Sequence, residues 1–146
     1  ARALNPPNRK KMTNTLAIAS DVMGQRLFAP PSVKGWDGGR AWINTSTMFV
    51  WQNTLLYLLT GQRPDSKAWE ADGTPFDAMA LVQGHTSRPK NTITHLLSTL
   101  LNMDSPSRDR IASLEDYMKT QKNAINNETV TGLLTLITSM PEYQLS

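Results

Sequence analysis

Residues 93–101 read ITHLLSTLL, and their apolar side chains recur at the spacing of a helix with one buried face. Pro89 suits the first turn of such a helix, because its missing N–H would have no intrahelical acceptor there. Residues three, four, seven and eight positions apart share one side of an α-helix. That spacing relates Ile93 to Leu96, Leu97, Leu100 and Leu101. The stretch therefore predicts a helix packed against other parts of the protein.

On both sides of this stretch, similar periodicities and helix-ending residues predict further helices. Their expected positions are about Arg9 to about Gln25, Asn44 or Thr45 to about Thr60, Phe76 to about Gln83, a helix opened by Ser105-Pro106, and a last helix capped by Asn126 or Asn127 and closed by Pro141. No stretch shows the alternation typical of a strand. The expected fold class is all-α, an irregular bundle of about five or six helices with a long Gly/Pro/Trp-rich loop after the first.

Each helix is expected to bury its apolar stripe. The stripes are Leu16, Ala19, Val22, Met23 and Leu27 in the first helix, Met48, Trp51, Leu55, Leu58 and Leu59 in the second, and Phe76, Met79 and Ala80 in the short one. A chain of 146 residues is the size of one domain. We therefore expect a single helical domain over residues 1–146, with the polar, turn-rich residues 62–75 as a flexible connection inside it.

The charge is uneven along a chain whose net charge is +3. Residues 1–63 carry eight Lys or Arg against two Asp, whereas residues 64–146 carry seven against ten Asp or Glu. The basic run Arg9-Lys10-Lys11 could contact phosphate, but it is short and has no aromatic residues within it. A solvated helix start explains it better, so nucleic acid is an unlikely partner. No apolar run approaches the ~20 residues of a membrane span.

Catalytic and metal-binding patterns are not visible. The chain has no cysteine, and its two histidines, His85 and His95, do not form an HExxH or similar ligand spacing. It also lacks a Gly-x-Ser-x-Gly nucleophile motif. We therefore expect no metal site and no cofactor, the catalytic residues are unknown, and whether the protein is an enzyme stays uncertain.

The Trp loop, residues 28–42, has the most unusual composition of the chain. It reads FAPPSVKGWDGGRAW, in which prolines and glycines make regular structure improbable. Its candidate binding residues are Lys34, Trp36, Asp37, Arg40 and Trp42, which could stack against a sugar ring or clamp an acidic group. Alternatively, the loop is structural, its indoles fill gaps between helices, and Arg40 pairs with Asp37 or caps carbonyl groups. Buried indoles predict a loss of about 3 kcal/mol or more on substitution by Ala.

The Trp loop and its flanks resemble a known family. Residues 23–44 read MGQRLFAPPSVKGWDGGRAWIN, and they closely resemble the C-terminal part of a bacterial family known as domain of unknown function 1800. Its members share a Gly-Gln-x-Leu-Phe helix end, Pro-Pro-x-Val-Lys-Gly-Trp, and Gly-Gly-x-x-Trp-Ile. Residues 139–144, SMPEYQ, are similar to the Ser-Pro-Glu-Phe-Gln-like tail of these proteins, with one inserted residue and Tyr in place of Phe.

The resemblance implies where such a protein is found and how large it is, but it implies no reaction, cofactor or catalytic residue. Family members are mostly helical, several hundred residues long, frequently exported, and abundant in planctomycetes. The chain is then expected to be a C-terminal fragment of an exported protein, periplasmic or at the cell surface, whose partner is the missing N-terminal part. Two functions are expected. The first is a non-catalytic structural or interaction module. The second is a part of a carbohydrate-processing or carbohydrate-binding protein, with the Trp loop lining the cleft.

Overall fold

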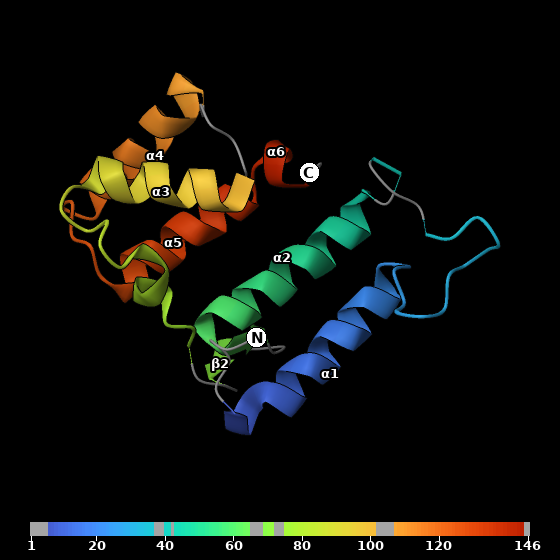
Figure 1. Ribbon diagram of the computed structural model, residues 1–146. Helices are drawn as coiled ribbons and strands as arrows, with labels where there is room; N and C mark the ends of the chain where they lie inside the picture. The colour runs from blue at the N-terminus through green and yellow to red at the C-terminus, as the bar shows by residue number, and fades with distance from the viewer. Residues whose placement is uncertain are drawn as a thin grey trace. The chain divides into compact units, whose positions relative to one another are not determined.

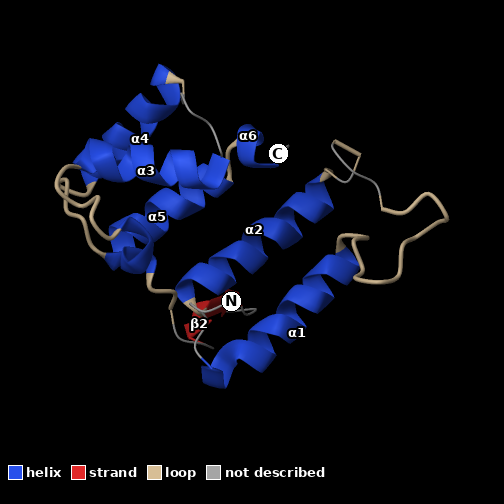
Figure 2. Ribbon diagram, in the orientation of Figure 1, coloured by secondary structure: helices blue, strands red, loops and turns tan. Residues whose placement is uncertain are grey.

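The computed structural model describes residues 6–36, 40–41, 43–64, 69–71, 75–101 and 107–144 (Figure 1). Within them the chain is mainly helical, which confirms the all-α fold class (Figure 2). The chain forms two compact units, residues 1–76 and residues 77–146. Their boundary follows the connection predicted for residues 62–75. The two units are described separately.

Unit 1 is built on two helices, α1 (Pro6–Val22) and α2 (Thr45–Thr60), which lie side by side and run in opposite directions (Figure 1). α1 ends at the predicted glycine. Gly24 has a φ of 73°, its N–H donates to the carbonyl of Asp21, and the N–H of Gln25 donates to that of Ser20. These two bonds make a Schellman motif, which needs a left-handed residue at this position.

α2 begins and ends as the sequence predicts. The Asn44 side chain accepts a hydrogen bond from the Thr47 N–H at 3.0 Å, and the Thr47 hydroxyl accepts one from the Asn44 N–H at 2.9 Å. This reciprocal capping box satisfies donors that the first helical turn leaves without acceptors. At the other end the N–H of Gly61 donates to Tyr57, and Gly61 is left-handed.

A small hairpin follows α2. β1 (Gln62–Pro64) pairs antiparallel with β2 (Trp69–Ala71), and Arg63 lies opposite Glu70. The sequence did not indicate these strands, because three residues are too few for an alternating pattern to be recognised. The N–H of Phe76 donates to the carbonyl of Leu59, which holds the end of unit 1 to α2.

The buried side chains of unit 1 are small or polar, and here the predicted stripes are partly wrong. In α2 the buried residues are Thr47, Thr54 and Tyr57, whereas the five residues of the expected stripe are only half-buried. Of the stripe in α1, Ala19 is buried and Val22 is exposed. The physical reason is that α2 is apolar on several sides, so periodicity alone cannot select the inward face.

Unit 2 is a cluster of helices around α5. Its elements are the 3₁₀ helix η1 (Ala78–Val82) and the α-helices α3 (Pro89–Leu101), α4 (Arg108–Thr120), α5 (Asn127–Thr138) and α6 (Pro141–Gln144). α5 contacts η1, α3, α4 and α6. The core consists of large aliphatic side chains, among them Val82, Ile93, Leu96, Leu97, Leu114, Met118, Val130, Leu133 and Ile137. The apolar face predicted for residues 93–101 is thereby confirmed.

Two expected details of unit 2 are wrong. The short helix is 3₁₀, and the residues that it buries are Ala78 and Val82, in place of the expected set. A 3₁₀ turn takes three residues, so the spacing of an α-helix does not select its buried residues. α4 is capped by Ser107, whose hydroxyl accepts a hydrogen bond from the Arg110 N–H. The expected cap, Ser105-Pro106, lies outside the described residues.

Polar contacts close unit 2 at its C-terminal end. The Arg110 guanidinium lies 3.1 Å from Oε1 of Glu142, which ties α4 to α6. A backbone hydrogen bond at Glu142 and the charge of Arg110 lower the pKa of the Glu142 carboxyl. The buried Gln144 amide donates to the carbonyl of Thr138 at 2.7 Å. The short α6 is therefore fixed by side chains, as its four residues could not hold it alone.

Candidate functional site

The Trp loop is organised around one carbonyl group that lies just before it. The oxygen of Arg26 accepts a hydrogen bond from the indole Nε1–H of Trp36 at 3.0 Å. It accepts a second one from the N–H of Ala29 at 3.2 Å. The first bond spans ten residues and the second closes a turn over residues 26–29. Ala29 and Trp36 are thus both hydrogen-bonded to the carbonyl of Arg26.

A second turn lies inside the loop. Ser32 and Gly35 form an isolated antiparallel bridge, and the N–H of Gly35 donates to the carbonyl of Ser32 at 3.0 Å. The Ser32 hydroxyl also accepts from the N–H of Lys34. Gly35 has a φ of 89°, a conformation that a side chain disfavours. Glycine at this place is therefore required by the turn.

The predicted binding residues are placed only in part. Lys34 and Arg40 are exposed, and Trp36 is 42% exposed. Asp37 and Trp42 lie outside the described residues, and so does the expected pair between Arg40 and Asp37. The structure therefore joins Trp36 to a backbone carbonyl, and it leaves the two cationic side chains of Lys34 and Arg40 open to solvent.

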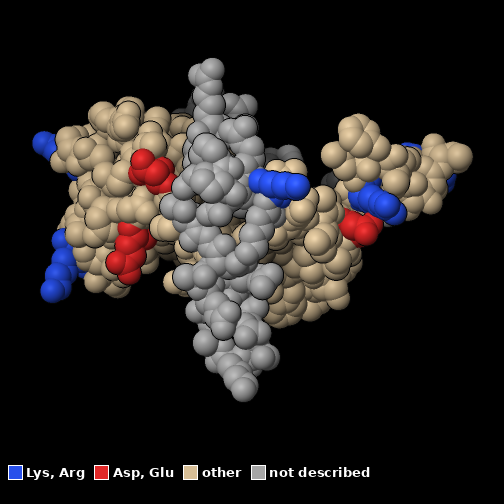
Figure 3. Space-filling view, turned by 90° about the horizontal axis from the view of Figure 1, so that it is seen from below, with Lys and Arg blue, Asp and Glu red and all other residues tan. Residues whose placement is uncertain are grey.

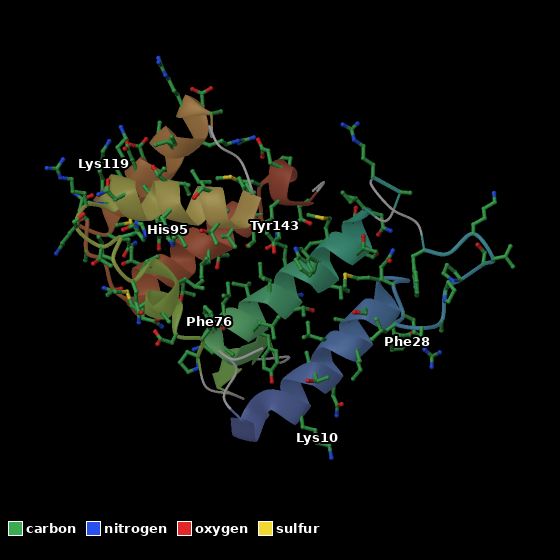
Figure 4. The ribbon with its side chains drawn as sticks, viewed as in Figure 1. Lys10, Phe28, Phe76, His95, Lys119 and Tyr143 are labelled. Atoms are coloured by element: carbon green, nitrogen blue, oxygen red, sulfur yellow. The ribbon has the colours of Figure 1, made fainter. Side chains whose placement is uncertain are left out.

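Exposed apolar side chains in this region were not predicted, and the burial predicted for Leu27 in the stripe of the first helix is wrong. Leu27, Phe28 and Val33 are all exposed, Phe28 by 90%. Phe28 also has a φ of 61°, at the third position of the turn over residues 26–29 (Figure 4). A bulky residue with positive φ is a genuine outlier. The only sequence signal for it was the tight spacing between the helix stop at Gly24 and Pro30-Pro31.

Replacing Trp36 by Ala should lower the free energy of unfolding by about 1–2 kcal/mol, less than the 3 kcal/mol of a buried indole, since the ring is only partly buried. Urea denaturation followed by far-UV circular dichroism measures this loss. Trp36→Phe keeps a ring and removes the N–H, so it should cost about 1 kcal/mol for the hydrogen bond to Arg26. A loss above 3 kcal/mol for Trp36→Ala would contradict the half-exposed position.

The two histidines lie in unit 2 and meet there. Their rings stack with centroids 3.9 Å apart and an angle of 8° between the planes. His95 Nε2 lies 3.0 Å from the carbonyl oxygen of Leu81 (Figure 4). Parallel stacked rings direct their in-plane nitrogen lone pairs along parallel planes, so the pair does not converge on one ion in this arrangement. Among the described residues, no three His, Asp or Glu side chains gather as metal ligands would.

Comparison with known proteins identifies a family. The model of the family described as "Protein of unknown function (DUF1800)" matches residues 2–145. No curated protein and no solved structure matches the chain. In the part of the chain that the structure describes, no helix has the length and apolarity needed to cross a membrane.

Proposed function

This chain belongs to the DUF1800 family of proteins of unknown function, and we propose that it is a non-catalytic interaction module at the C-terminal end of a longer, exported bacterial protein. The observation that carries the proposal is Phe28, an aromatic side chain held almost completely in solvent by a left-handed backbone. The surface that we propose, the docking loop, consists of Leu27, Phe28 and Val33.

The first support is energetic. A left-handed conformation costs a residue with a side chain roughly 1–2 kcal/mol, and a glycine at the same place would avoid this cost. Phe28 in this conformation, with its ring in water, does not stabilise the isolated chain. Backbone strain of this kind persists mainly where function requires it. A ring that becomes buried on docking explains both the strain and the exposure.

The second support is the composition of the same surface. Three large apolar side chains lie exposed within seven consecutive residues of one loop. The bonds of the Arg26 carbonyl to Ala29 and Trp36 fix the loop that carries them. A grouped and fixed set of exposed apolar residues marks an interaction surface, whereas isolated exposed residues do not. Little ordering entropy remains to be lost when such a loop docks.

The occupant that we propose is the preceding part of the same polypeptide. A photo-crosslinking amino acid at position 28 of the longer protein should give crosslinks to peptides that precede residue 1 in the same chain, identified by mass spectrometry. The control is the same probe at Asn53, an exposed polar residue of α2 in the same unit. The proposal would be contradicted if the probe at position 28 gave no crosslinked peptide, or gave no more crosslinked peptide than the probe at position 53. Crosslinks to another protein alone would contradict the choice of occupant.

A second candidate function is carbohydrate binding by the Trp loop. The indole of Trp36 is fixed by its hydrogen bond and leaves 42% of the residue exposed, and Lys34 lies two positions before it. A fixed indole face can stack against a sugar ring. Titration with oligosaccharides should then shift the tryptophan fluorescence of the protein. Because Trp36→Phe also removes the fluorescent indole, the binding of this variant is measured by isothermal titration calorimetry, and its affinity for the oligosaccharide should fall. A sugar-induced shift that Trp36→Ala retains would exclude this loop as the binding site.

A further inference from the structure

A shallow basic pocket lies in unit 2, where α3 begins and α4 ends. The two helices contact each other, and these ends meet at the left in Figure 1. The pocket has a volume of about 280 Å³ and is lined by Arg88, Pro89, Lys90, Glu115, Lys119 and Asn123. This volume is near the lower limit of small-molecule sites, roughly 300 Å³. It suits a group of a few heavy atoms better than a coenzyme.

The charges around the pocket favour an anion. Three of its lining side chains are cationic and one, Glu115, is a carboxylate, so the lining carries a net charge of +2. This contrasts with the acidic excess of residues 64–146 as a whole. Figure 3 shows Lys and Arg side chains projecting at the left edge, the side on which α3 begins in Figure 1.

Lys119 is held at the pocket by its neighbour on the same helix. Its ammonium group lies 2.8 Å from Oδ1 of Asp116 (Figure 4). The hydrogen bond with Asp116 raises the pKa of Lys119. Because both side chains are exposed, the pair contributes little to stability. Its effect is to restrict where the Lys119 charge lies.

A backbone donor is added by the first turn of α3. The N–H groups of Asn91 and Thr92 both donate to the carbonyl of Arg88, and Pro89 has no N–H. The N–H of Lys90 has no acceptor among the described residues, and Lys90 is one of the residues that line the pocket. Arg88 can supply a planar pair of donors, and the two lysines supply compact charges.

We propose that this pocket binds a doubly charged tetrahedral oxyanion, a phosphate or sulfate group, between Arg88, Lys90 and Lys119. The cationic excess of the lining favours a negatively charged group, and charge-assisted hydrogen bonds from guanidinium and ammonium groups to such oxygens are stronger than neutral ones. The site is open to solvent, so water weakens these charge interactions and we expect weak binding. It is separate from the docking loop, and it holds whether or not the docking loop has the function proposed above.

The test is a titration of the full chain with inorganic phosphate, and separately with sulfate, at constant ionic strength set with chloride. Amide resonances are followed by ¹H–¹⁵N NMR. Saturable shifts are expected for Lys90 and its neighbours with at least one of the two anions. The double variant Arg88→Gln/Lys90→Gln should raise the dissociation constant at least tenfold, with an unchanged melting temperature.

A matched control removes two cationic side chains elsewhere. Lys10→Gln/Arg108→Gln changes the net charge equally, at exposed positions that do not line the pocket, and should change the dissociation constant less than twofold. Two results would overturn the proposal. The first is the absence of a saturable shift with either anion. The second is an equal weakening by both double variants, which would mean general electrostatic attraction without a site.

Discussion

Ile137→Ala should lower the free energy of unfolding by about 2–5 kcal/mol, the largest effect that we expect from a single substitution in this chain. Ile137 is fully buried on α5, the helix that contacts every other element of unit 2. Removing three carbons there forfeits the transfer free energy of the side chain and leaves a cavity that surrounding helices can fill only in part. Urea denaturation followed by far-UV circular dichroism gives the loss directly.

The adjacent residue provides a matched control. Leu136 has the same number of side-chain carbons on the same helix but is 40% exposed. Leu136→Ala should therefore cost clearly less than Ile137→Ala, about 1 kcal/mol, because less apolar surface returns to water and no closed cavity forms. Equal losses for the two variants, or a loss below 1 kcal/mol for Ile137→Ala, would show that α5 is not the centre of a packed core.

In unit 1, replacing an exposed apolar residue is expected to leave the free energy of unfolding almost unchanged. Phe28→Gly removes a side chain that has little packing to lose and places the one residue that tolerates positive φ. The two effects leave the stability of the isolated chain unchanged or slightly higher. A substitution of a large aromatic residue without a cost to folding is the expected signature of a residue retained for contact with a partner.

The helices of unit 2 could be predicted because each carries one unambiguous apolar face. In residues 93–101 the aliphatic side chains leave only one direction for burial, and the structure buries Ile93, Leu96 and Leu97 completely. α2 carries apolar residues on several sides, so the same reasoning selected the wrong face. Its ends were nevertheless predicted, because the Asn44 cap and the Gly61 stop are local and depend on few neighbours.

The candidate sites were harder to predict, for two different reasons. Gly24 at the end of α1 and Gly35 in the Trp loop are glycines, the residue type that most readily adopts a left-handed conformation, whereas Phe28 adopts it against its own preference. No propensity indicates such a residue. The basic pocket depends on tertiary contact, because Lys90 and Lys119 belong to different helices and share a pocket only where α3 and α4 meet. Because the two lysines are far apart in the sequence, the sequence alone does not indicate that they line one pocket.

Asn127→Ala should lower the free energy of unfolding by about 2 kcal/mol, although the residue is polar and only half-buried. Its Oδ1 accepts hydrogen bonds from the N–H groups of Ala78 at 2.7 Å and Met79 at 3.3 Å. These bonds hold the start of η1 against α5, and the first N–H belongs to a residue that is fully buried. Each buried donor left without an acceptor costs roughly 1–3 kcal/mol, so losing both exceeds the value of one ordinary hydrogen bond.

The variant Asn127→Asp tests whether the acceptor oxygen of Asn127 alone accounts for its contribution to stability. The carboxylate keeps an oxygen for both N–H groups, and a negative charge in the first turn of α5 is favourable. The free energy of unfolding of Asn127→Asp should therefore stay within about 0.5 kcal/mol of the wild-type value. In Asn127→Ala, by contrast, the amide hydrogen of Ala78 should exchange with solvent about 30-fold faster, the equivalent of about 2 kcal/mol. Unchanged exchange at Ala78 in Asn127→Ala would mean that another group holds η1 in place. The cost of that variant would then have to come from α5 itself, and the link between residues that are 49 positions apart in the chain would lose its stabilising role.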